Sequence, residues 1–154
     1  MIQWYRPNFF AGGQVRAQTL NQYIHTLVEL PRVQGFLNHY DNQQSFQCPP
    51  VVVVPSCGSL VAALTYGNRL IEVSSWILVD DSETYSVLRH EFAHVIKAHC
   101  KLPGTPHGQG YIQSLKNVSP KTWHKDKYWY PTVDIEEARL RMHPKSKTIL
   151  NRAR

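Results

Sequence analysis

The stretch LRHEFAHVIKAH, residues 88–99, constrains the fold and the chemistry of this chain more than any other feature. It places His90 and His94 four residues apart, with Glu91 directly after the first histidine. On an α-helix, His94 then lies about 40° and Glu91 about 100° around the axis from His90. The opposite arc is apolar and holds Leu88, Phe92, Val95 and Ile96. The pattern therefore predicts a helix with one core face and one face that gathers the two histidines and the glutamate.

This spacing suits a catalytic zinc ion. Two imidazoles one helical turn apart can bind a single ion at about 2.0–2.1 Å. The glutamate beside the first ligand, Glu91, is then placed to hold a zinc-bound water rather than the metal. As a general base it would take a proton from that water and pass it to the leaving amine. The alternative is a helix that carries two solvated histidines and no metal.

A site with two histidines needs a third protein ligand, and catalysis leaves the fourth position to water. We predict His107, because the LPGTP loop before it can fold the chain back over the metal. Cys100 stands where the longer HExxHxxGxxH motif has its third histidine, but Lys97 replaces the glycine that ends the helix in that motif. His99 lies on the opposite side of the helix from His90. We therefore expect neither Cys100 nor His99 to bind the metal.

Composition limits the class of protein. The 154 residues suit one domain, and 42% hydrophobic against 18% charged residues is typical of a globular chain rather than a disordered one. We expect no membrane span and no signal peptide, because no apolar run is long enough and the N-terminus lacks the usual pattern. Three cysteines without a CxxC pair favour a reducing compartment, and we expect a cytoplasmic protein without a disulfide framework.

The excess of positive over negative charge is confined to the C-terminal quarter of the chain. Residues 1–115 carry seven basic and seven acidic side chains, whereas residues 116–154 carry ten basic and four acidic ones, which accounts for the whole net charge of +6. Such a segment predicts an anionic partner, with DNA the first candidate, although a solubilising tail is the alternative. We expect a single domain over residues 1–142, a basic tail over 143–154 and a monomer.

The remaining pattern predicts an α+β fold. The expected elements are a helix over 15–30, a strand over 49–55, a hairpin of strands 60–66 and 69–74, the helix that carries the motif, a helix over 107–117 and a last helix over 133–142. We expect a small, mostly antiparallel sheet of about three strands packed on the motif helix, with an N-terminal helix and C-terminal helices. A substrate chain would pair with an edge strand, for which we propose residues 69–74.

Two segments of the chain, residues 66–99 and 103–115, resemble a known family. YGNRLIEVSSWILVDDSETYSVLRHEFAHVIKAH and PGTPHGQGYIQSL resemble the SprT-like zinc metallopeptidases, the Spartan-related family with a zincin-like fold. The resemblance covers roughly residues 50–118, and its narrowest element is the H-G-x-x-aromatic pattern from His107 to Tyr111. It implies that His90, His94 and His107 bind zinc, that Glu91 is the catalytic base and that Tyr111 packs behind the third ligand.

The resemblance implies a zinc-dependent endopeptidase that acts on protein substrates, including proteins associated with DNA. The Cys-rich zinc ribbon of many relatives is absent, and KTWHKDKYWYP follows instead. Its rings could stack on bases or form a small core, and we expect at least half of the four to pack: Trp123, Tyr128, Trp129 and Tyr130. Candidates for stabilising an oxyanion are Tyr128, Tyr130, His124 and Arg139.

Two other functions remain open from the sequence. One is an HExxH peptidase of the ImmA/IrrE-like or minimal gluzincin type, in which Glu136 or Glu137 supplies the third ligand in place of His107. The other is a non-catalytic zinc-containing module that binds nucleic acid through the basic segment. A closed shell of four protein ligands would favour the module, and an open coordination position would favour catalysis.

Overall fold

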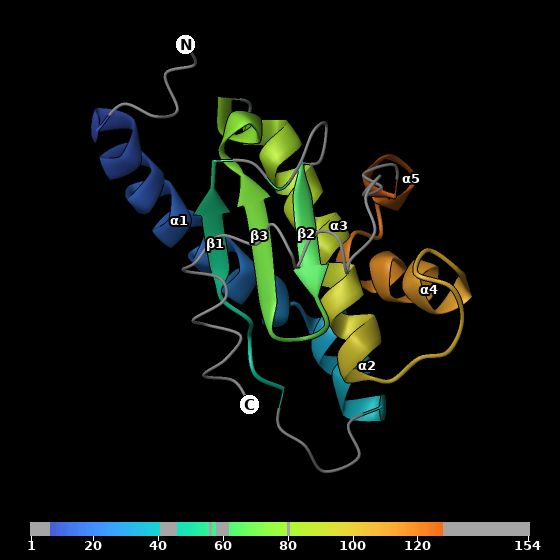
Figure 1. Cartoon of the computed structure of the whole chain (residues 1–154). Helices are drawn as coiled ribbons and strands as arrows, with labels where there is room; N and C mark the ends of the chain where they lie inside the picture. The colour runs from blue at the N-terminus through green and yellow to red at the C-terminus, as the bar shows by residue number, and fades with distance from the viewer. Residues whose placement is uncertain (1–6, 41–45, 56, 58–61, 80, 128–154) are drawn as a thin grey trace.

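The computed structural model describes residues 7–40, 46–55, 57, 62–79 and 81–127 (Figure 1). The elements in chain order are α1 (Pro7–Val28), α2 (Pro31–Tyr40), β1 (Val51–Val54), β2 (Ala63–Tyr66), β3 (Leu70–Ser74), the 3-10 helix η2 (Ser75–Val79), α3 (Asp81–His99), α4 (Gln109–Val118) and α5 (Trp123–Asp126). The α+β class is confirmed. The predicted helix over 133–142 and the predicted tail over 143–154 lie outside the described residues.

The sheet has three strands in the order β1-β3-β2 and is mixed. β2 pairs antiparallel with β3, with Tyr66 opposite Leu70, whereas β1 pairs parallel with β3, with Val51 opposite Ile71. The prediction of a mostly antiparallel sheet is therefore wrong for one of the two pairings. The run of four valines in β1 is typical of parallel strands, which are buried on both faces, but it does not identify the partner strand.

The prediction that residues 69–74 form the edge strand is also wrong. β3 lies in the centre of the sheet, and the strand at the edge beside α3 is β2. The hairpin itself is confirmed. Gly67 has φ +60°, a conformation that costs glycine little, and the amide of Arg69 donates to the Tyr66 carbonyl at 3.1 Å across the turn.

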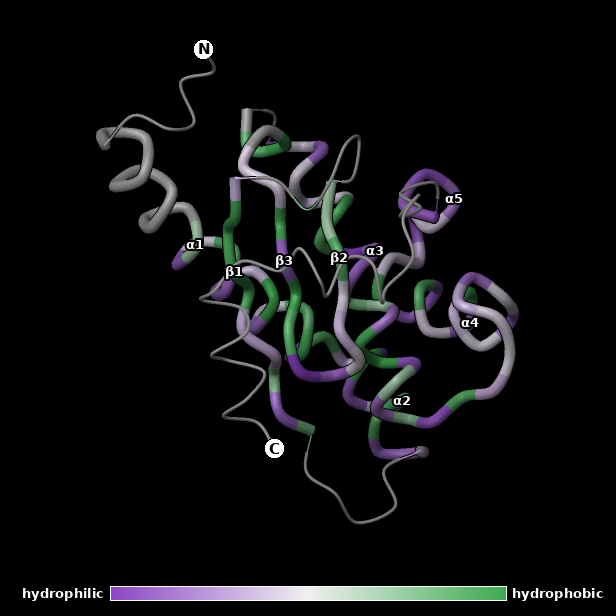
Figure 2. The backbone as a smooth tube through the Cα atoms, in the orientation of Figure 1, coloured by the Kyte–Doolittle hydropathy of each residue, from purple (hydrophilic) through white to green (hydrophobic). Residues whose placement is uncertain are grey.

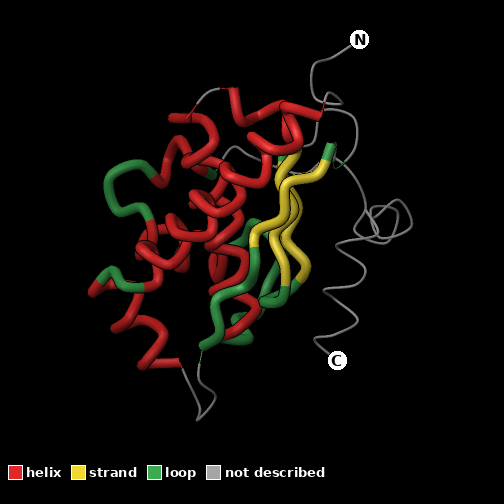
Figure 3. The backbone as a smooth tube through the Cα atoms, turned by 90° about the vertical axis from the view of Figure 1, so that its left-hand side faces the viewer, coloured by secondary structure: helices red, strands yellow, loops and turns green. Residues whose placement is uncertain are grey.

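The described helices gather on one side of the sheet (Figure 3). The main core fills the space between that face and the helices, and Figure 2 shows the hydrophobic colouring of β1 and β3 that borders it. α1 contributes Leu20, Ile24 and Leu27, all nearly or fully buried, at the spacing of one helical face. This confirms an amphipathic N-terminal helix, although α1 begins at Pro7 and ends at Val28 rather than spanning the predicted residues 15–30.

α1 is also joined to the sheet by a polar contact. The side-chain amide of Asn21 donates to the carbonyl of Val51 at 2.9 Å and accepts from the Val51 amide at 2.8 Å. Asn21 thus occupies both backbone groups of Val51 at the outer edge of β1, where an unpaired strand would otherwise expose them. No helix in the described ranges combines the length and the apolar character needed to cross a membrane.

Candidate metal centre

α3 carries the motif, and its packing follows the predicted faces. Acidic side chains stand in its first turn, at Asp81 and Glu83, where they complement the helix dipole. Its core face is fully buried and contains Leu88, Phe92, Val95 and Ile96. α4 packs beside α3, and Ala93 forms a small separate cluster with Tyr111 and Leu115 of α4. α3 is therefore held from two directions, which fixes how its polar face is turned.

The chain reverses after α3 through a Schellman motif. The amide of Leu102 donates to the Lys97 carbonyl at 3.1 Å and the amide of Lys101 donates to the Ala98 carbonyl at 3.2 Å. Lys101 takes a left-handed φ of 53°, at the position where glycine is usual. The following loop returns along α3, and the Lys97 ammonium donates to the carbonyl of Gly104 at 3.3 Å.

His107 lies in the turn at the end of this loop, two residues before α4 begins. Gly108 lets the chain pack tightly there, because a Cβ at this position would lie 2.6 Å from Oγ1 of Thr105. A Cβ on Gly110 would lie 3.0 Å from the carbonyl oxygen of Pro103. The two glycines therefore allow the loop and the start of α4 to approach closely, and His107 is carried back to α3.

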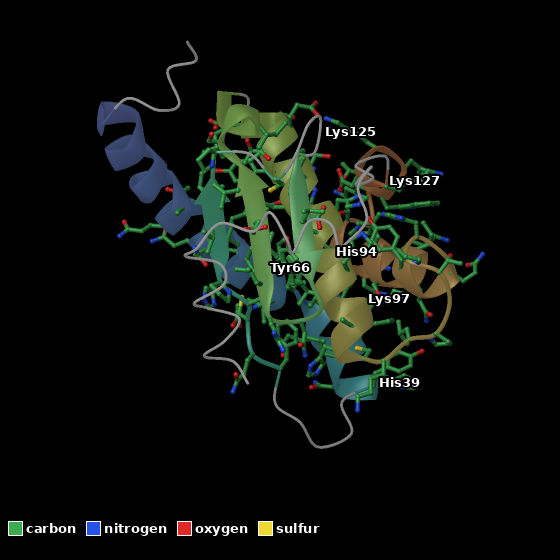
Figure 4. All side chains as sticks on the ribbon, in the orientation of Figure 1. His39, Tyr66, His94, Lys97, Lys125 and Lys127 are labelled. Atoms are coloured by element: carbon green, nitrogen blue, oxygen red, sulfur yellow. The ribbon has the colours of Figure 1, made fainter. Side chains whose placement is uncertain are left out.

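The Nε2 atoms of three histidines converge on one point. His94 Nε2 lies 3.3 Å from His90 Nε2 and 3.1 Å from His107 Nε2, and the third side of the triangle is 3.2 Å. Within the described part of the chain, these three side chains form a group close enough to bind a metal ion. His94 points from α3 towards the α4 side, beside Lys97 (Figure 4).

A hydrogen bond determines which nitrogen of His90 faces that point. His90 Nδ1 lies 2.6 Å from the backbone carbonyl of Asp126. A carbonyl only accepts, so Nδ1 carries the proton and Nε2 keeps its lone pair for the metal. Burial lowers the pKa of His90 to about 4 and, together with neighbouring positive charges, holds the pKa of His94 well below its usual range. Burial and Lys97 lower the pKa of His107. The imidazoles are therefore neutral at neutral pH, as metal ligands must be.

The triangle has the dimensions of a tetrahedral site. Zinc–nitrogen bonds of about 2.0–2.1 Å place two ligand atoms of a tetrahedral ion about 3.3–3.4 Å apart, and the three separations here are 3.1–3.3 Å. Three neutral nitrogens whose lone pairs converge repel one another unless a cation or a proton lies between them. The donor set and its spacing thus fit a first-row divalent ion such as zinc.

Glu91 is buried beside the histidines and faces β2. Its side chain is 2% exposed. The Thr65 hydroxyl donates to Oε2 of Glu91 and lies 3.3 Å from the Glu91 backbone carbonyl. Burial raises the pKa of Glu91 to about 8, although the hydrogen bond from Thr65 opposes that rise. In the metal-free protein the carboxyl group is therefore largely protonated near neutral pH.

Tyr111 supports all three imidazoles. Its ring stacks on His94 with centroids 4.3 Å apart and contacts His90 at 5.2 Å and His107 at 5.0 Å. Its hydroxyl donates to the His90 carbonyl at 3.3 Å. Tyr111 is fully buried. The resemblance implies that it packs behind His107, and in the structure it packs against His90 and His94 as well.

The other candidate residues lie apart from the histidines or outside the described ranges. Cys100 is buried in the main core, and His99 packs against Phe46 with ring centroids 5.0 Å apart. His124 is exposed on α5, next to the ring of Trp123. The alternative third ligands Glu136 and Glu137 and the oxyanion candidates Tyr128, Tyr130 and Arg139 fall on undescribed residues. In the described part of the chain, the cysteines at positions 48, 57 and 100 form no disulfide.

Sequence reasoning missed two residues of the site. Thr65 contacts Glu91 from the edge strand, and Asp126 contacts His90 from α5, 36 residues downstream. Neither belongs to a recognisable motif, because both contacts depend on how separate elements pack. A weak signal existed for Asp126, since it is the single acidic residue among the lysines of KTWHKDK.

Comparison of the chain with protein-family models, curated proteins and solved structures found no match in any of the three.

Proposed function

We propose that the chain is a zinc-dependent metalloendopeptidase of the SprT-like type, with a zincin-like fold. The observation that carries this proposal is the convergence of His90, His94 and His107, with the carboxyl group of Glu91 buried beside them on the same helix. Three imidazoles suit zinc, which favours nitrogen ligands and tetrahedral geometry. Bound there, zinc would keep one position open for water, lower the pKa of that water towards about 7 and polarise a substrate carbonyl.

Glu91 is the proposed general base. Its position directly after His90 places it next to the metal site rather than among the ligands. A nearby divalent cation favours the ionised form of a carboxyl group, so the raised pKa of Glu91 in the metal-free protein falls when the site is loaded. The carboxylate would then accept the proton of the attacking water, and the protonated acid would return it to the leaving amine.

β2 is the proposed docking strand for the substrate. It is the edge strand beside α3, and its Thr65 contacts Glu91. A peptide that adds to this edge in extended form would pass beside the Glu91 carboxylate. Main-chain hydrogen bonds would then supply much of the binding energy, which makes accessible backbone in the substrate more important than particular side chains.

The described part of the basic segment is consistent with a role near DNA. Lys116, Lys121 and Lys125 are exposed and Lys127 is half-buried. The Lys116 and Lys127 ammonium groups lie 4.7 Å and 5.4 Å from the ring centroid of Trp123. Figure 4 shows Lys125 and Lys127 on the α5 side of the molecule. Trp123 also packs against the cluster of Ala93, Tyr111 and Leu115, so we assign DNA contact to the lysines and packing to the ring.

The salt dependence of DNA binding tests this assignment. Lys116→Gln with Lys121→Gln should weaken binding of a single-stranded oligonucleotide and reduce the slope of log affinity against log salt by about 0.7 for each lost phosphate contact. Lys101→Gln, an exposed lysine on the loop after α3, should leave the slope unchanged. Equal slopes in all variants would refute the assignment of DNA contact to these lysines.

Glu91→Gln tests the enzymatic proposal. The variant should retain zinc, because Glu91 is not a ligand, and should lose cleavage of an unfolded protein substrate, offered both free and bound to DNA. Full activity in this variant would overturn the proposal. A parallel His107→Ala variant should lose zinc. If it keeps zinc while Glu136→Ala or Glu137→Ala loses it, the site is of the alternative type with a glutamate as third ligand.

A further inference from the structure

A buried polar network on the far side of His90 is not explained by the proposed chemistry. Its centre is Asp126, the last residue of α5, whose side chain is fully buried. Oδ2 of Asp126 accepts from Nε of Arg89 at 2.8 Å and from the Thr122 hydroxyl at 3.0 Å. Oδ1 accepts from the Ser86 hydroxyl at 2.6 Å and from Nη2 of Arg89 at 3.2 Å.

The network joins two elements that are distant in sequence. Ser86 and Arg89 belong to α3, one turn and one residue before His90, whereas Thr122 and Asp126 belong to the α5 region. Arg89 extends the network to α1, because its Nη1 donates to the Tyr23 hydroxyl at 3.0 Å. Burial would raise the pKa of Asp126, but the hydrogen bonds from Arg89 and Ser86 outweigh it and lower that pKa. Nε of Arg89 also forms an ion pair with Oδ2 of Asp126 at 2.8 Å, so Asp126 is a charged acceptor and its bonds to α3 are strong.

The same residue holds the metal ligand through its backbone. The carbonyl of Asp126 accepts the proton on Nδ1 of His90 at 2.6 Å. α5 has only four residues and its N-cap, Thr122, makes no side-chain cap hydrogen bond. A single short turn of this kind has little stability of its own. The position of the carbonyl therefore depends on the side-chain bonds that attach Asp126 to α3.

We propose that Asp126 is the positioning residue of the metal centre. Its carboxylate attaches α5 to Ser86 and Arg89, and its carbonyl consequently keeps His90 in the tautomer that presents Nε2 to the metal. This inference rests on the proposed metal site and adds the residue that prepares one of its ligands. Hydrogen-bond partners of metal-binding histidines typically contribute 10–100-fold to metal affinity.

Four variants test the inference. Asp126→Asn removes the negative charge and replaces one acceptor oxygen by an NH2 group. That group cannot accept the bonds that Oδ2 now accepts from Nε of Arg89 and from the Thr122 hydroxyl. Ser86→Ala and Arg89→Lys each remove only part of the hydrogen bonding to the Asp126 carboxylate. They can therefore still be measured if Asp126→Asn fails to fold. Thr84→Val is the matched control, because it removes a buried hydrogen bond of α3, from Thr84 to the Ile77 carbonyl, that is not one of the bonds to Asp126.

Two measurements are made on each variant: zinc affinity by competition with a chelator, and the tautomer of His90 by nitrogen NMR of the metal-free protein. We expect wild-type His90 to carry its proton on Nδ1. Asp126→Asn should mix the two tautomers and weaken zinc binding by about 10–100-fold. Ser86→Ala and Arg89→Lys should show smaller losses in the same direction, and Thr84→Val should change neither measurement.

Two results would overturn the inference. One is unchanged zinc affinity and an unchanged His90 tautomer in all three network variants while the wild type binds zinc, an outcome that leaves the proposed function intact. The other is an equal loss of affinity in Thr84→Val, which would mean that general destabilisation of α3 is the cause. A wild-type protein that binds no zinc contradicts the proposed function instead, and the tautomer measurement then decides separately whether Asp126 positions His90.

Discussion

The two faces of α3 are both buried, but one is apolar and the other carries the polar side chains of the candidate metal centre. On one side Leu88, Phe92, Val95 and Ile96 are fully buried among apolar side chains. On the other side His90 and Glu91 are buried just as deeply but carry polar atoms. The apolar side needs only volume and contact, whereas each polar group needs a specific partner, because a buried polar group without one is costly.

The partners of the polar side come from three separate segments. Thr65 on β2 binds Glu91, Asp126 on α5 binds His90, and His107 at the end of a loop completes the group of histidines. Both sides need distant elements, but the core side accepts any well-packed apolar neighbour, whereas the site side needs particular polar residues of those elements in particular positions. The core side should therefore govern folding and the site side should govern metal binding.

Phe92→Ala should give the largest change in stability. Removal of this buried ring from the main core should lower the free energy of unfolding by about 3–5 kcal/mol. The loss should be the same in metal-free and zinc-loaded protein, because Phe92 faces away from the histidines. Urea unfolding with and without zinc measures both values. A loss confined to the zinc-loaded protein would show that the two sides are not separable.

His94→Ala, in contrast, should change stability mainly in the presence of zinc. Zinc at about 1,000 times its dissociation constant should stabilise the wild type by about 4 kcal/mol, and this gain should vanish in the variant. His99→Ala is the control, since His99 lies on the same helix but outside the group of histidines. Thermal unfolding with and without zinc measures the effect. Retained zinc stabilisation in His94→Ala, or its loss in His99→Ala, would contradict the assignment of ligands.

Glu91→Gln should change the pH dependence of stability in the metal-free protein. The pKa of Glu91 is raised from 4.5 to about 8 in the folded state, so the folded protein binds more protons than the unfolded chain between these values. The stability contributed by the protonated group is complete below pH 4.5 and is lost as pH rises through 8.

Comparison with Glu91→Gln between pH 6.5 and 8 isolates this effect, because both proteins keep the histidines of the site and their lowered pKa values contribute equally to the two curves. The wild type should lose stability across this pH range relative to Glu91→Gln, which has no group to ionise at this position. Denaturant unfolding at several pH values measures the difference. Parallel curves for the two proteins would mean that Glu91 is already ionised without metal.

Lys101→Gly should give the smallest effect. The left-handed conformation of Lys101 is unfavourable for a residue with a side chain, and glycine removes that cost while it adds entropy to the unfolded chain. We expect a net gain of about 0.5 kcal/mol in the free energy of unfolding. Ala98→Gly, three residues earlier within the exposed surface of α3, should instead lose about 0.5–1 kcal/mol. Destabilisation by both variants would mean that the loop has no strain at Lys101.

The sequence allowed accurate prediction wherever the signal was local. α3 and its apolar face follow from the period of the motif, the hairpin follows from Gly67, and the helix after His107 follows from its apolar spacing. The three histidines that the structure brings together are the three that the pattern and the resemblance predict. Each of these features depends on residues close together in the sequence, or on the short loop between α3 and His107, which keeps His107 near α3.

The predictions failed where pairing between distant segments decides the outcome. The parallel partner of β1 could not be derived, because nothing in the four valines distinguishes β3 from β2. Because the pairing of β1 with β3 could not be derived, the central position of β3 could not be derived either, and β2 was not recognised as the edge strand beside α3. Thr65 and Asp126 were missed because a threonine in a strand and an aspartate among lysines have many ordinary roles, and only the docking of β2 and α5 on α3 gives them theirs.

Whether His90, His94 and His107 together bind a catalytic zinc ion can be measured by X-ray absorption at the zinc edge, together with zinc content, on the reconstituted protein. We expect one zinc per chain with three imidazole nitrogens and one light atom from water, all at about 2.0–2.1 Å. In His107→Ala the imidazole signal should fall together with the zinc content. A chain that takes up no zinc, or a shell closed by four protein ligands, would contradict this expectation.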